Sequence, residues 1–145
     1  MKNIKIFSLL TLSIILFSCN GRAQENQFKV DNKTSKIEVI DFYGTHRCVT
    51  CKAIEANARY TLKTYFIKEL NSGKISFKTV NVDDKNNYAM AENYQAAGTA
   101  LFLNIIKNGK ETHIDLTDFG FSKGRNQEEF SKELKAKIET ELKKL

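Results

Sequence analysis

The feature that most constrains the fold is an apolar strand that leads, through a short turn, into an amphipathic helix. Residues 37–43 read IEVIDFY, a β-rich and almost continuously apolar segment, which is typical of a strand buried on both faces. Gly44 and Thr45 interrupt this pattern. From about Cys48 to Leu70 apolar residues recur every four positions, which predicts a helix with one buried face.

The rest of the pattern predicts a β-α-β-α-β-β-α order. We expect three more strands and two more helices, over residues 75–82, 100–106 and 111–116, and over residues 84–95 and 126–142. Asn108-Gly109 predicts a tight hairpin between the last two strands, and Asn126 with Glu129 forms a capping-box pattern. We expect no helix between Thr117 and that cap. A β-α-β start followed by a hairpin indicates the α/β class, with a mixed central sheet covered by helices.

The first 36 residues are expected to lie outside this fold. Residues 1–18 combine two early lysines with an apolar run that is too short to span a membrane, which is typical of a secretory signal. The run ends in LFSC and resembles a bacterial lipobox, which implies cleavage before Cys19 and lipid attachment to it. A plain signal peptide with an incidental cysteine is the alternative. Residues 19–36 are polar and are expected to form a flexible tether, which leaves residues 37–145 as the folded domain.

Composition and charge exclude several classes of protein. Three cysteines are too few for a disulfide-stapled miniprotein, and a chain without proline is not Pro-rich or collagen-like. The formal charge is +6, but the basic residues are interspersed with acidic ones, as in KAKIETELKKL near the C-terminus. This is typical of a solvated helix face. We therefore expect no nucleic-acid partner, and export from the cytoplasm points the same way.

Two cysteines three positions apart, Cys48 and Cys51, fall where the first strand gives way to the first helix. At a helix N-terminus, unpaired N–H groups and the helix dipole favour a thiolate at the first of them. The second lies one turn along, close enough to form a reversible disulfide. His46, Arg47 and Lys52 add positive charge, and we expect all three to lower the pKa of Cys48.

A Cys-x-x-Cys pair by itself leaves several interpretations open. A zinc site needs two more ligands, and His46, His113 and Cys19 are poor candidates, so we expect no metal site. A purely structural disulfide would close a very small loop and restrain little chain entropy. Two further uses remain, namely thiol–disulfide exchange and binding of a soft metal ion or a trivalent arsenical by the dithiol.

Two segments around this motif resemble the thioredoxin family. VIDFYGTHRCVTCK is similar to that family's strand, active-site turn and helix start, and YQAAGTALFLNIIKNGKE is similar to its later strand and hairpin. The resemblance implies a thioredoxin-like fold over residues 37–145, with Cys48 as nucleophile and Cys51 as resolving thiol. It implies that Asp41 is the buried carboxylate that accepts the Cys51 proton. The redox-active disulfide is then the only reactive group, without a cofactor.

The sequence departs from the thioredoxin pattern at three places. Arg47 replaces the tryptophan that usually precedes the first cysteine, and Val49-Thr50 replaces Gly-Pro between the cysteines. The family's cis-proline is missing, and Ala100 occupies the equivalent position. A cis bond without proline costs about 2.5–4 kcal/mol, so we predict a trans peptide between Thr99 and Ala100.

A more specific resemblance covers FYGTHRCVTCKAIEANARYTLKTYF, which is similar to small bacterial thioredoxin-like proteins described as nitrophenyl compound nitroreductase subunits. It implies a lipid-anchored redox protein of the bacterial cell envelope, facing the periplasm or the outer membrane, with a possible place in an aromatic nitro or arsenical reduction or resistance system. The expected partners are a disulfide-containing protein substrate and a membrane electron conduit or permease. The alternative is a non-catalytic carrier that binds a soft metal or arsenical on the same dithiol.

Overall fold

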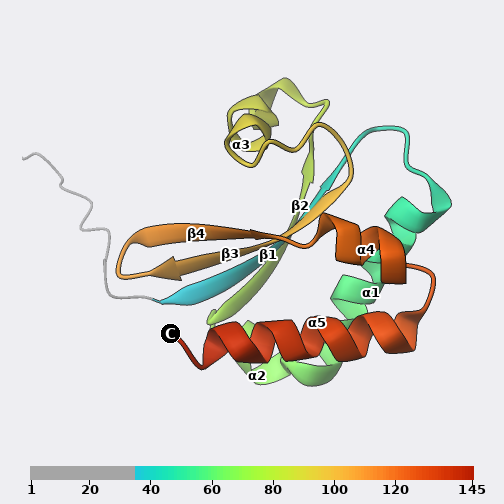
Figure 1. Cartoon of the computed structure of the whole chain (residues 1–145). Helices are drawn as coiled ribbons and strands as arrows, with labels where there is room; N and C mark the ends of the chain where they lie inside the picture. The colour runs from blue at the N-terminus through green and yellow to red at the C-terminus, as the bar shows by residue number, and fades with distance from the viewer. Residues whose placement is uncertain (1–34) are drawn as a thin grey trace, which may run out of the picture. The chain divides into compact units, whose positions relative to one another are not determined.

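The computed structural model describes residues 35–145, in which four strands and several helices alternate along the chain (Figure 1). In order these are β1 Lys36–Tyr43, α1 Val49–Tyr65, α2 Ile67–Asn71, β2 Ile75–Asn81, a 3₁₀ turn at Lys85–Asn87, α3 Tyr88–Asn93, β3 Ala100–Lys107, β4 Lys110–Asp115, α4 Thr117–Lys123 and α5 Gln127–Leu142. The signal and tether expected over residues 1–36, with Cys19, lie outside the described residues, except that Lys36 already begins β1.

The strands form one mixed sheet in the order β2-β1-β3-β4. β1 runs parallel to β2 and antiparallel to β3, and β4 is antiparallel to β3. Asn108 and Gly109 both have positive φ angles, 53° and 75°, as the tight hairpin predicted from the Asn-Gly pair requires. This connectivity and strand order define a thioredoxin-like fold and confirm the predicted α/β class with a mixed sheet.

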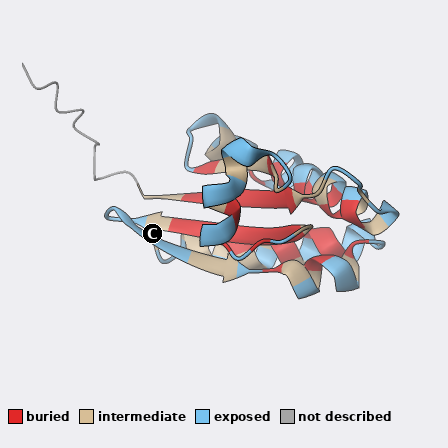
Figure 2. Ribbon diagram, turned by 90° about the horizontal axis from the view of Figure 1, so that it is seen from above, coloured by how far each residue is buried: buried red, intermediate tan, exposed pale blue. Residues whose placement is uncertain are grey.

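Helices cover the two faces of the sheet unequally (Figure 1). On one face, β1 and β3 side chains pack against α1 and α5 in the larger core, which includes Ile37, Val39, Ile54, Leu62, Leu101, Leu103, Phe130, Leu134 and Ile138. On the other face, the shorter α3 segment contributes Tyr94 to a smaller core, where its ring contacts those of Phe42 and Phe102 at centroid distances of 5.1 and 5.2 Å. The buried residues in Figure 2 therefore follow the central strands and the inner sides of the helices.

Two expectations about the helices were wrong in detail. Residues 117–123 form α4, where we expected no helix. Its Gly120 is buried against Ile54 of α1, where a Cβ would lie 3.4 Å from the Ile54 side chain, an ordinary van der Waals distance. The first helix is also interrupted at Phe66, whose φ and ψ of −130° and 29° leave the helical region while its ring is buried in the larger core.

No helix within residues 35–145 is both long and apolar enough to cross a membrane. The peptide bond between Thr99 and Ala100 is trans, as predicted. Ala100 begins β3 and pairs with Phe42 near the end of β1, so this connection lies at the end of the sheet from which the chain leaves towards Cys48.

Candidate active site

Cys48 and Cys51 are joined by a disulfide at the N-terminus of α1, with a Cα–Cα distance of 5.0 Å. Cys48 is the N-cap residue: its backbone is extended, and its Sγ accepts a hydrogen bond from the Cys51 amide at 3.0 Å. α1 is 17 residues long and has no acidic residue in its first turn. Within that turn no acidic side chain opposes the unpaired amides and the helix dipole, which favours the Cys48 thiolate once the disulfide is reduced.

The two cysteines differ sharply in exposure. Cys48 is exposed and is followed by Val49, which is 78% exposed, whereas Cys51 is 7% exposed. An incoming disulfide can therefore reach Cys48, while Cys51 faces the protein interior. The roles of nucleophile and resolving thiol stay predictions for Cys48 and Cys51.

Asp41 is a fully buried carboxylate on β1, at 0% exposure. Its Oδ2 accepts a hydrogen bond from Arg47 Nη2 at 3.0 Å, while its Oδ1 has no hydrogen-bond partner among the described residues. Burial raises the pKa of Asp41 to about 7, and Arg47 opposes this effect only in part. Near neutral pH this carboxyl group can therefore exist with or without a proton, as an acid–base group requires.

Arg47 has two acidic partners that the sequence did not predict. Its side chain is 15% exposed, lies over the Tyr43 ring at 4.6 Å, and forms ion pairs with both Asp41 and Glu55. The same Nη2 that contacts Asp41 also donates to the Cys51 carbonyl, at 3.1 Å. The contacts of Arg47 are therefore with two carboxylates and the Cys51 carbonyl, and its effect on the pKa of Cys48 stays a prediction.

Glu55 is a site residue that the sequence reasoning missed. It bridges two arginines, accepting hydrogen bonds from Arg47 and, at 2.7 Å, from Arg59 Nε. Burial raises its pKa, but the hydrogen bonds from both arginines outweigh this, so the pKa lies below its usual value. Glu55 is four residues beyond Cys51, and helical spacing alone would have placed it on the same face of α1.

His46 and Lys52 are exposed near the disulfide, and within residues 35–145 neither side chain forms a hydrogen bond or an ion pair. The loop that carries His46 is held by Asp83, whose Oδ2 accepts a hydrogen bond from the Thr45 amide at 2.6 Å. That hydrogen bond lowers the pKa of Asp83. Asp83, which lies 38 positions after Thr45, thus helps to hold the loop that leads to the first cysteine.

A second segment that we did not predict reaches the motif from the connection between α4 and α5. Arg125 Nε donates to Thr50 Oγ1 at 3.1 Å, between the two cysteines. The preceding Gly124 accepts a hydrogen bond at its carbonyl from buried Asn57, at 2.9 Å. A Cβ at Gly124 would lie 2.7 Å from the Gly120 carbonyl and 3.2 Å from Thr50 Cγ2, so only glycine allows this approach.

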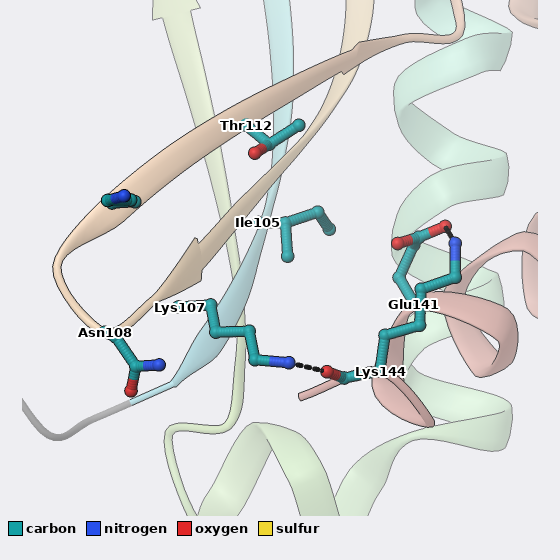
Figure 3. A pocket seen from close by; sticks show the side chains of 7 residues that line it. Ile105, Lys107, Asn108, Thr112, Glu141 and Lys144 are labelled. Atoms are coloured by element: carbon teal, nitrogen blue, oxygen red, sulfur yellow. Dashed lines mark hydrogen bonds and ion pairs between the residues drawn. The ribbon is translucent and has the colours of Figure 1, made fainter.

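Other clusters of side chains do not join this site. Within residues 35–145, no group of three or more His, Cys, Asp or Glu side chains could hold a metal ion. A cavity of about 480 Å³ lies between the β3–β4 hairpin and the C-terminal end of α5 (Figure 3). Lys107, Lys110 and Lys144 line it, and it lies at the end of β3 opposite to Ala100.

The fold and the site together define the class: a thioredoxin-like protein with a Cys-x-x-Cys disulfide, consistent with thiol–disulfide exchange. Among solved structures, the chain is similar to a thioredoxin of Fasciola hepatica, at 23% identity over 64% of this chain and 80% of that one, with a TM-score of 0.40. It is also similar to mitochondrial thioredoxin 3 of Saccharomyces cerevisiae in its oxidised form, at 22% identity over 65% and 80%, with a TM-score of 0.41.

No protein-family model and no curated protein sequence matches this chain. The fold assignment accordingly rests on the strand order, the strand directions and the connectivity described above.

Proposed function

We propose that this protein is a thiol–disulfide oxidoreductase of the bacterial cell envelope that reduces a disulfide in a protein substrate. The observation that carries the proposal is the asymmetry of the Cys48–Cys51 disulfide, in which Cys48 is exposed at a helix N-terminus and Cys51 is buried, with Arg47 bonded both to the Cys51 carbonyl and to the buried carboxylate of Asp41. A structural disulfide needs neither the exposure of Cys48 nor an acid–base group such as Asp41.

The reaction begins from the reduced pair. The Cys48 thiolate attacks one sulfur of the substrate disulfide, forming a mixed disulfide and releasing the other substrate sulfur as a thiolate. Cys51 then gives its proton to Asp41 and attacks Cys48 Sγ. This forms the Cys48–Cys51 disulfide and releases the second substrate thiolate. The substrate gains two electrons, and a dithiol donor must return them to the protein.

The proposed location in the cell envelope is supported by the N-terminal sequence. The lipobox-like LFSC segment supports a lipid anchor at Cys19, and the resemblance of the active-site block supports a membrane electron conduit or permease as the dithiol donor. Mass spectrometry of the membrane-extracted protein tests the anchor. A mature N-terminus at Cys19 that carries acyl chains supports it, and an unmodified Cys19 contradicts it.

Trapping the mixed disulfide tests the reaction. Replacing Cys51 with Ser removes the resolving thiol, so Cys48 should stay bonded to its substrates. We expect the full-length Cys51→Ser variant to form covalent complexes that dissociate on addition of a reductant. Cys48→Ser, which retains the buried cysteine, is the matched control and should trap far less.

The same variants separate exchange from the carrier function. A carrier needs both thiols reduced and bound to the ligand together, so loss of either cysteine should weaken arsenite binding equally and trap no protein. Equal effects of Cys48→Ser and Cys51→Ser on arsenite affinity, without covalent complexes, would contradict the oxidoreductase proposal.

A further inference from the structure

Arg47 contacts both of the residues that take part in the resolving step, Asp41 through its carboxylate and Cys51 through its backbone carbonyl. Its Nη2 lies 3.0 Å from Asp41 Oδ2 and 3.1 Å from the carbonyl oxygen of Cys51. We propose, on the basis of the function proposed above, that Arg47 is a positioning residue for that step. Its guanidinium favours the ionised form of Asp41 and holds the carboxylate in place through Oδ2, so that the free Oδ1 can accept the proton of the Cys51 thiol.

The hydrogen bonding of Asp41 supports a division of labour between its two oxygens. Oδ2 is occupied by Arg47, whereas Oδ1 is buried and has no partner among the described residues. A buried carboxylate oxygen without a partner is costly, and such an atom in a native site calls for an explanation. Acceptance of a proton at Oδ1 supplies that explanation and leaves the contact with Arg47 intact.

The charges that face Asp41 show why a cation is needed there. Burial disfavours the ionised carboxylate, and Glu55 on α1 disfavours it further. Arg47 acts in the opposite direction at hydrogen-bond distance, and Arg59 on α1 does so more weakly. The strands on either side place no charged residue directly opposite Asp41, since it pairs with Thr79 on β2 and with Leu101 on β3. Without Arg47, Asp41 would be protonated near neutral pH and could not act as a base.

Three contacts besides Asp41 hold the Arg47 guanidinium in place, and the fixed guanidinium in turn holds the Asp41 carboxylate. Glu55 binds Nη1, the Tyr43 ring lies 4.6 Å below the guanidinium carbon, and the Cys51 carbonyl accepts from Nη2. Lysine carries the same charge but offers a single ammonium group. It therefore cannot bridge the oxygens of Asp41, Glu55 and the Cys51 carbonyl in a planar arrangement.

The test separates the two exchange steps with an aromatic disulfide, 5,5′-dithiobis(2-nitrobenzoate), added to the reduced full-length protein. Attack by Cys48 releases one thionitrobenzoate, and attack by Cys51 on the mixed disulfide releases the second. Stopped-flow absorbance resolves the two releases, and the second is followed as a function of pH. In the wild-type protein we expect the rate of the second release to rise with pH around the Asp41 pKa of about 7.

Arg47→Gln should shift the midpoint of the second release upward by about 1–3 pH units, because an opposite charge at this distance lowers a carboxyl pKa by that amount. Near neutral pH the second release should slow by about tenfold or more, since each pH unit corresponds to a factor of ten in the ionised fraction. The first release should change little. Arg47→Lys should give an intermediate midpoint, which provides a second measurement if Arg47→Gln folds poorly.

The matched control is Arg59→Gln, which removes an arginine from Glu55 but makes no hydrogen bond or ion pair to Asp41. We expect it to shift the midpoint of the second release much less than Arg47→Gln does, because Arg59 acts on Asp41 only as a more distant charge. Asp41→Asn tests the route: Arg47→Gln should have no further effect on the midpoint in the Asp41→Asn background. If Arg47→Gln leaves the midpoint of the second release unchanged, the inference is wrong. It is also wrong if Arg47→Gln slows the second release as much in the Asp41→Asn background as it does in the wild-type protein. Absence of any second release in the wild-type protein would instead refute the proposed function itself.

Discussion

Replacing Asp41 with Asn should stabilise the oxidised protein, and the gain should depend on pH. Folding raises the pKa of Asp41 from 3.8 to about 7, so the folded state binds this proton more tightly than the unfolded state does. The free energy of unfolding therefore falls as pH rises through the window from about 4 to about 7, and it stays lowered above that window. Asn at this position does not titrate, which removes this loss.

The shift sets the size of the expected effect. About three pKa units, at about 1.4 kcal/mol each, give an upper limit of about 4 kcal/mol above pH 7. Asn also weakens a hydrogen bond to the Arg47 cation, and bonds of that type contribute about 1.5–3 kcal/mol. We therefore expect Asp41→Asn to raise the free energy of unfolding by about 2 kcal/mol at about pH 8, with little or no gain at about pH 4.

Urea denaturation of both oxidised proteins at several pH values measures this difference, with the slope m checked for constancy. Asp118→Asn is the matched control, since Asp118 is exposed in the first turn of α4 and its substitution should stay within about 0.5 kcal/mol at every pH. A gain that does not change with pH, or a loss of stability at about pH 8, would refute the argument that burial of this carboxylate costs free energy.

Two further predictions concern the segment that reaches the Cys-x-x-Cys motif from the connection between α4 and α5. Gly124→Ala should lower the free energy of unfolding by about 1–3 kcal/mol because its Cβ would lie 2.7 Å from the Gly120 carbonyl, as measured by urea denaturation. Gly98→Ala is the control, because a Cβ at Gly98 meets nothing within 4 Å and should not lower the free energy of unfolding. If both substitutions lower that free energy equally, the close approach of Gly124 to the Gly120 carbonyl is not what matters. Asn126→Ala should cost about 1 kcal/mol by thermal denaturation, because its side chain accepts the Glu129 amide at 3.0 Å and caps α5. Asn126→Asp, which keeps the cap, should restore most of that loss.

Periodicity predicted most of the sheet and the long helices because each of these elements is recorded in neighbouring residues. The four strands occupy the predicted segments within a residue or two, and Asn126 caps α5 as its spacing with Glu129 indicated. The failure at α4 has the opposite cause. Two glycines weaken any local helix signal there, and α4 packs on Ile54 of α1, a contact between segments far apart in sequence that no local pattern records.

By itself, the sequence determined the cysteine pair and its position on the fold. Cys48 and Cys51 are neighbours in the chain, and the switch from strand to helix periodicity around them placed them at a helix N-terminus. Only the tertiary structure decided which charges act on that pair. Arg47 was expected to act on Cys48, yet the turn after β1 directs it to Asp41 and Glu55, and Arg125 reaches Thr50 from 75 residues away. Electrostatic effects depend on distance and burial in space, and sequence spacing fixes neither for a loop residue.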